Sequence, residues 1–178
     1  LAVTFTDTKS YFVSEASVYR LLKTHDLITS PNFIVIKAAS EFKDKTTAIN
    51  QMWQTDFTYL KIIGWGWYYL STILDDYSRY IISWKLCTTM RAEDVHPQTQ
   101  GKIERWHQTL KNRILLEHYY LPGDLEAQVE AFVEYYNHQR YHESLKNVTP
   151  ADAYFGRAET IIKQRERIKR KTIEQRRL

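Results

Sequence analysis

Residues 52–86, MWQTDFTYLKIIGWGWYYLSTILDDYSRYIISWKL, contain three runs of β-forming residues separated by two turn signals. Along 52–62 the residues alternate between two sides. Aromatic residues at Trp53, Phe57 and Tyr59 fall on one side, and polar residues fall on the other. This period of two predicts a β-strand.

The rest of the stretch continues the same pattern. The glycines of 64–66 predict a tight turn. Residues 67–74 form a nearly continuous apolar run, which is typical of a strand buried on both faces. A second polar turn at 75–79 leads into a third strand at 80–86. Three strands joined by short turns predict an antiparallel meander.

Asp56 lies in the middle of the first predicted strand, on the side away from the aromatic residues. Acidic residues are disfavoured inside strands, so this position needs an explanation. One explanation is an edge-strand acid that faces water, and the other is a functional carboxylate.

A second distinctive stretch, HPQTQGKIERWHQTLKNR, occupies residues 96–113. Pro97 prevents a helix from entering from upstream, because the residue before proline is pushed out of the α region. Beyond it, the apolar spacing predicts an amphipathic helix. Glu104, Gln108 and Lys111 share a different face of that helix. From helix physics alone, the simplest interpretation is that these polar side chains point into solvent and have no further role.

Together, WQTDFTYLK at 53–61 and HPQTQGKIERWHQTLK at 96–111 resemble the integrase core of bacterial insertion-sequence transposases, the DDE enzymes related to retroviral integrases. The resemblance implies a ribonuclease H-like α/β fold and DNA strand transfer that depends on Mg²⁺ or Mn²⁺. It implies that Asp56 and Glu104 are the first and third metal-binding carboxylates, and that Gln108 and Lys111 face DNA. It also places Asp75 and Asp76 in a turn that is not catalytic.

One part of the resembling family's pattern is absent from this sequence. The resemblance implies a second catalytic Asp in an Asp-Asn-Gly context, and no Asp-Asn-Gly occurs in the chain. We infer an internal deletion between 95 and 96. We therefore expect an incomplete three-stranded core, an exposed aromatic surface, self-association and defective activity. Two hypotheses stay open: a DDE transposase in origin, or a non-catalytic DNA-binding remnant that competes with the full-length enzyme.

The N-terminal part contains VSEASVYRLLKTHDLI at 13–28, which resembles the final helix of a helix-turn-helix. Ser14 is the expected N-cap. In such a motif Arg20 and Lys23 would approach DNA. A plain packing helix is an equal alternative.

The part after residue 120 predicts two further helices. The first is expected to begin with Asp124 as its N-cap, and the second follows Thr149 and Pro150. The apolar stripe of the first helix is Leu125, Val129, Phe132, Val133 and Tyr136. Between the helices, Asn137, Arg140 and His142 would either pack or touch DNA backbone, and packing is the better-supported role.

The chain of 178 residues divides into a partial helix-turn-helix at 1–28, a linker at 29–50, the core at 51–156, interrupted near 95/96, and a tail at 157–178. The tail has nine Lys and Arg against three Glu, a net charge of +6, and is expected to be helical or disordered. The whole chain carries +4, which fits a DNA partner. With no membrane-spanning run and one cysteine, Cys87, we expect a soluble protein, and the resemblance implies the bacterial cytoplasm and nucleoid.

Overall fold

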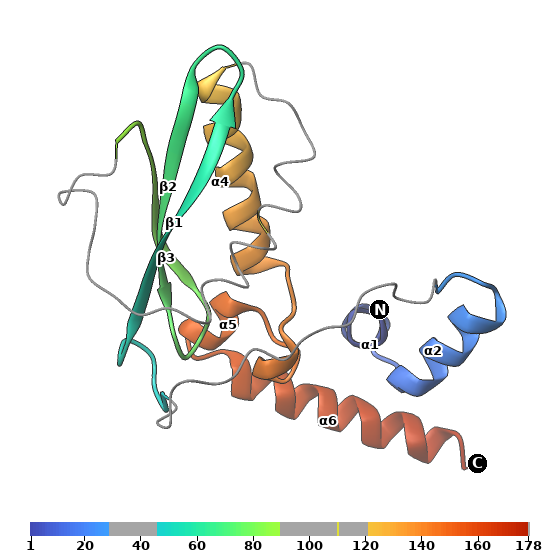
Figure 1. Cartoon of the computed structure of the whole chain (residues 1–178). Coiled ribbons are helices and arrows are strands. Elements are labelled where there is room, and N and C mark those ends of the chain that lie inside the picture. The colour runs from blue at the N-terminus through green and yellow to red at the C-terminus, as the bar shows by residue number, and fades with distance from the viewer. Residues whose placement is uncertain (29–45, 90–109, 111–120, 178) are drawn as a thin grey trace. The chain divides into compact units, whose positions relative to one another are not determined.

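The computed structural model describes residues 1–28, 46–89, 110 and 121–177 (Figure 1). The described residues fall into two compact units. One unit combines residues 1–39 with 157–178, and the other contains 40–156. The elements in chain order are α1 (Ala2–Lys9), α2 (Glu15–Thr24), β1 (Trp53–Ile62), β2 (Gly66–Asp75), β3 (Ile81–Cys87), α4 (Pro122–His138), η2 (Glu143–Leu145), α5 (Pro150–Tyr154) and α6 (Ala158–Gln175).

The three strands of the second unit form one antiparallel sheet in the order β1-β2-β3. The predicted meander is therefore confirmed, with strand ends within one residue of the prediction. Gly64 and Gly66 both have positive φ, 84° and 98°, in the turn between β1 and β2. Only glycine adopts such angles without strain, which explains the two glycines of the turn.

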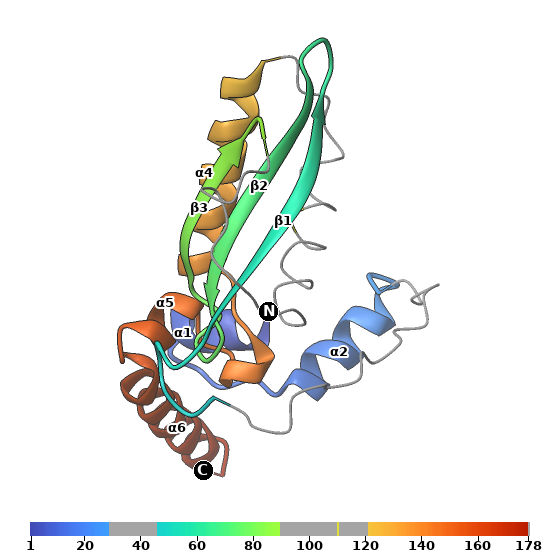
Figure 2. The same ribbon diagram turned by 60° about the vertical axis from the view of Figure 1, so that its left-hand side comes forward.

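One face of the sheet packs against α4, which runs alongside the strands in both views (Figures 1 and 2). The predicted stripe of α4 is confirmed, because all five of its apolar residues are buried. From the sheet, the core receives Leu60, Ile62, Leu70, Leu74 and Ile81. The helix begins at Pro122 rather than after Asp124, and Asp124 lies in its first turn instead of capping it. Proline suits the first helical position because its missing N–H would be unsatisfied there anyway.

The other face of the sheet corrects one prediction. The apolar run 67–74 predicts a strand buried on both faces, but β2 alternates between buried and more exposed residues. Trp67 is exposed, and Tyr69, Ser71 and Ile73 on the same side are only partly buried. The core lies on the side of Leu70, Thr72 and Leu74. We call the opposite side the outer face.

In the first unit, the N-terminal segment and α6 pack together. Asp7 and Arg165 form a two-point ion pair, with oxygen–nitrogen distances of 2.8 and 2.6 Å. The Phe12 amide donates to the Thr172 hydroxyl at 3.0 Å. Of the two states expected for the basic C-terminal stretch, helical or disordered, the structure shows a helix, α6, over Ala158–Gln175, and this helix packs against the N-terminal segment.

The sequence predictions for residues 1–28 are confirmed in part. The N-cap of α2 is confirmed, since the Ser14 hydroxyl accepts from the Ser17 amide at 3.1 Å. The helix α1 has no counterpart in the sequence predictions, because its Thr-rich stretch has weak helix propensity and no clear period. Arg20 and Lys23 lie on α2, whose residues are all at least partly exposed.

Several predictions fall outside the described residues. They include most of the linker, the junction at 95/96, and the helix that carries Glu104, Gln108 and Lys111. Leu110, from the predicted apolar face of that helix, is described and lies fully buried in the core.

Candidate active site

The strand β1 places Asp56 on the core side of the sheet. Side chains alternate along a strand, so Asp56 shares its side with Gln54, Thr58 and Leu60. In the register of the sheet it lies directly opposite Thr72 of β2. Asp56 is half-buried, and one of its carboxylate oxygens, Oδ1, accepts from the Phe57 amide at 2.7 Å. It is therefore not simply an edge acid that faces water.

Two buried hydroxyls flank Asp56. Thr58 and Thr72 are fully buried, and neither Oγ1 atom has a hydrogen-bond partner among the described residues. A buried hydroxyl without a partner costs roughly 1–3 kcal/mol, so each such group requires an explanation. Hard oxygen donors with room for water are what Mg²⁺ prefers. The carboxylate and two hydroxyls therefore fit one side of a site for a hydrated divalent cation.

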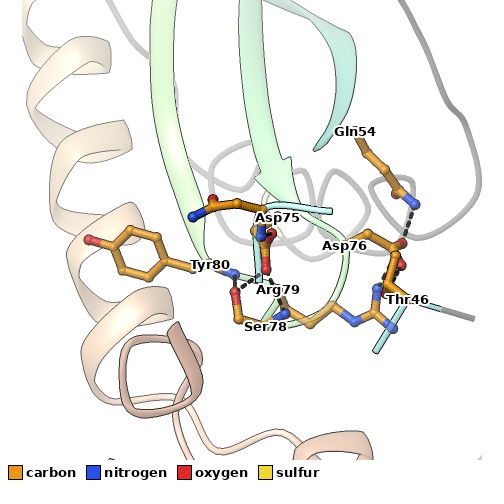
Figure 3. Close-up of polar contacts among 8 residues, drawn as sticks. Thr46, Gln54, Asp75, Asp76, Ser78, Arg79 and Tyr80 are labelled. Carbon is orange, nitrogen blue, oxygen red and sulfur yellow. Dashed lines mark hydrogen bonds and ion pairs between the residues drawn. The ribbon is translucent and has the colours of Figure 1, made fainter. Parts of the chain in front are cut away.

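Asp75 belongs to a buried network at the end of β2. Its Oδ2 accepts from the Ser78 amide at 2.8 Å and from the Ser78 hydroxyl at 2.6 Å (Figure 3). Its Oδ1 accepts from the backbone N–H of Asn50 at 2.8 Å. The side chain is completely buried. Asp75 therefore fixes the turn between β2 and β3 and ties it to the residues that precede β1.

Asp76 extends this network from the next position, also at 0% exposure. Its Oδ1 accepts from the Gln54 side-chain amide and pairs with Arg79 at 3.4 Å, and its Oδ2 accepts from the Thr46 hydroxyl (Figure 3). Every carboxylate oxygen of Asp75 and Asp76 thus holds a hydrogen bond. Both carboxylates therefore serve the structure of the turn and of the residues around it.

His138 and His142 are four residues apart, a spacing that can suit a metal ion, but in the structure the two rings have different neighbours. His138 lies 3.7 Å from Glu134, while the His142 ring meets the edge of Tyr136 at 4.9 Å. Burial, with help from Arg140, lowers the pKa of His142 to about 4, so its ring is neutral at pH 7. Among the described parts of the chain, no group of three His, Cys, Asp or Glu could hold a metal ion.

The polar run after α4 serves packing. Asn137 is buried, and its side-chain amide makes two bonds to one residue of β3: Oδ1 accepts from the Ile81 amide at 2.9 Å, and Nδ2 donates to the Ile81 carbonyl at 3.1 Å. Arg140 lies over the Tyr136 ring at 5.6 Å. Burial raises the pKa of Tyr136 to about 12. The expected packing role of Asn137 and Arg140 agrees with these contacts.

Sequence reasoning missed two parts of this arrangement. A signal existed for Asp75, because Asp followed by Ser three residues later is typical of a side-chain-capped turn. The hydroxyls of Thr58 and Thr72 gave no signal, because threonine is common in strands and its burial depends on tertiary packing.

The fold and site define an α/β domain with a carboxylate on the core side of its first strand. Residues 46–109 match the family model named Integrase core domain, and residues 87–150 match a second model with the same description. The stretch 46–150 is therefore an integrase core domain of the integrase and transposase type, with a ribonuclease H-like α/β fold. The matched residues lie inside the second structural unit.

A search of the solved structures finds no significant match. Within the described residues, no helix is both long and apolar enough to cross a bilayer. Integrase core domains act on DNA and generally use divalent metal ions, and their presence indicates a function in DNA integration.

Proposed function

We propose that this chain derives from an insertion-sequence transposase and that its own catalytic centre is incomplete. The observation that supports this best is the position of Asp56, half-buried on the core side of β1 beside the hydroxyls of Thr58 and Thr72. An acid and two unpaired hydroxyls weaken a packed core, so a ligand-binding role explains them better than stability does.

The roles of individual residues follow from this proposal. When bound, two divalent ions would activate an attacking hydroxyl and stabilise the leaving oxygen in DNA strand transfer. Asp56 would hold the first carboxylate position, and Glu104, which lies outside the described residues, would hold the third. No Asp-Asn-Gly is present to supply the second. Because Asp75 and Asp76 are occupied by hydrogen bonds, they do not compensate for that loss.

A strand-transfer assay on terminal-repeat DNA tests the enzymatic part. The 178-residue chain should show no activity with Mg²⁺ or Mn²⁺. Restoring the missing block with its Asp should restore activity, and Asp56→Asn or Glu104→Gln in the restored protein should abolish it. Strong metal-dependent strand transfer by the present chain would contradict the proposed deletion.

Metal binding gives a readout that does not depend on activity. Titration with Mn²⁺, followed by electron paramagnetic resonance, should show weak binding of one ion. Asp56→Asn should remove this binding, and Asp124→Asn, a matched change of an exposed acid in the first turn of α4, should leave it intact. Equal binding by the Asp56→Asn variant would exclude Asp56 as a ligand.

The alternative function is a DNA-binding remnant that competes with the full-length transposase. The positive charge of the chain favours contacts with phosphate, through Lys111 in the core and through Arg20, Lys23 and α6 in the first unit, and the Gln108 amide would add a hydrogen bond. Neutralising three exposed residues of α6, Arg167, Arg170 and Lys171, with glutamine tests the contribution of this helix. If they bind phosphates, the slope of log affinity against log salt should fall by about 0.9 for each phosphate that is no longer neutralised. An unchanged slope would exclude α6 from the interface.

A further inference from the structure

The outer face of the sheet carries several exposed aromatic residues. Trp53 is 50% exposed, Tyr59 51% and Trp67 57%, although all three belong to regular strands. In the turn between β1 and β2, Trp65 is 60% exposed. Large aromatic side chains are seldom left in water in such a group unless they bind something.

Two of these aromatic residues, Tyr59 and Trp67, make contacts with residues on the neighbouring strand. Tyr59 lies opposite Tyr69, and their rings meet edge to face with centroids 5.4 Å apart. Lys61 lies opposite Trp67, and its ammonium group sits 5.7 Å from the indole centroid. Such pairs restrict side-chain rotation, so the rings present ordered surfaces before any ligand arrives.

Within the three described strands, the exposed charged residues of the outer face are lysines. Lys61 and Lys85 both lie on it and are exposed. The acids of β1 and β2 do not oppose them, because Asp56 lies on the core side and Asp75 is completely buried. The strand β3 contains no acid. A positively charged aromatic surface suits a polyanion with flat apolar groups.

We propose that the outer face binds single-stranded DNA, with unpaired bases stacked on Tyr59 and Trp67 and phosphates near Lys61 and Lys85. Aromatic rings combined with cationic side chains form the usual platform for unpaired bases, and the binding tolerates many sequences. A second copy of the chain fits less well, because two outer faces would bring like charges together. This site is distinct from the Asp56 side of the sheet and needs no metal ion.

A comparison of two ligands isolates the stacking contribution. The whole chain is titrated against a fluorescent oligo(dT) and against an abasic oligonucleotide of the same length and charge, with fluorescence anisotropy as the readout. Because phosphate contacts elsewhere in the chain are common to both ligands, they cancel in the ratio of affinities. The oligo(dT) should bind about tenfold or more tightly than the abasic ligand.

Variants connect that ratio to the outer face. Tyr59→Ala with Trp67→Ala should bring the ratio close to one, and Trp67→Phe should preserve most of it. Tyr135→Ala on α4, another exposed aromatic, is the matched control and should not change it. Because the substituted residues are exposed, their loss should leave the circular dichroism spectrum unchanged.

Two results would overturn the proposal. The first is an equal affinity of the wild-type chain for the two ligands. The second is a ratio that survives in the Tyr59 and Trp67 double variant. If that variant instead turned a dimer into a monomer in sedimentation, with no change in the ratio, the outer face would be a contact between copies.

Discussion

Replacing Asn137 with alanine should destabilise the second unit strongly. The change removes two hydrogen bonds and leaves the amide and carbonyl of Ile81 without their partners. Asn137 is 4% exposed and Ile81 3%, so water does not readily replace the lost bonds. Hydrogen bonds contribute about 1 kcal/mol each, and a buried group left unsatisfied costs about 1–3 kcal/mol. We therefore expect a loss of about 2–4 kcal/mol, a large part of a typical domain's stability.

Urea unfolding measures this loss. All five tryptophans of the chain belong to the second unit, and Trp84 packs against its core, so tryptophan fluorescence reports on the unfolding of this unit. The urea midpoint should fall while the slope of free energy against urea stays constant. Gln139→Ala, an exposed amide two residues later, is the control and should change stability by less than about 0.5 kcal/mol. A loss below about 1 kcal/mol for Asn137→Ala would refute the reasoning, because Ile81 would then have found other partners.

Three further predictions concern separate parts of the chain. The pKa of His142 is about 4 in the folded chain, below the ordinary value of 6.5. Between these two pH values the unfolded chain binds a proton at His142 and the folded chain does not, so the free energy of unfolding decreases as pH falls from about 6.5 towards 4. The loss should reach about 2 kcal/mol after allowance for solvent around the partly exposed ring, and urea unfolding at pH 7 and 4.5 should show less pH dependence for His142→Gln. Thr72→Val removes an unpaired buried hydroxyl and should raise the unfolding free energy by about 1 kcal/mol; a decrease would mean that the hydroxyl has a partner. Asp7→Asn breaks the ion pair with Arg165 and should destabilise the first unit by up to about 1 kcal/mol, seen as faster proteolysis near residues 10–28; unchanged cleavage would mean that the pair is dispensable.

The sheet was predictable because its signals are local. Alternation along β1 and the glycines at 64 and 66 locate the hairpin without knowledge of the rest of the fold. The caps at Ser14 and Thr149 depend on residues only three positions away, and both are confirmed. The buried stripe of α4 follows from its helical period alone.

The remaining features depend on contacts between distant residues. The alternation of β1 separates Asp56 from the aromatic residues, but it does not indicate which side is buried. The core formed on the side with Leu60 and Ile62, and this left Trp53 and Tyr59 in solvent. Burial of Asp75 likewise depends on Asn50, which lies 25 residues away. No local pattern reports such a partner.

The pairing of the N-terminal segment with α6 sets an order of events during protein synthesis. Asp7 and Arg165 are separated by 158 residues, and the whole integrase core domain is translated between them. At about 5–20 residues per second, the ribosome needs on the order of ten seconds to supply α6 after the N-terminal segment emerges. During that interval the N-terminal segment lacks its packing partner, while the hairpin of β1 and β2 is already complete. A chain that stalls before residue 165 would therefore expose the segment to proteases and chaperones, even if its sheet had begun to fold.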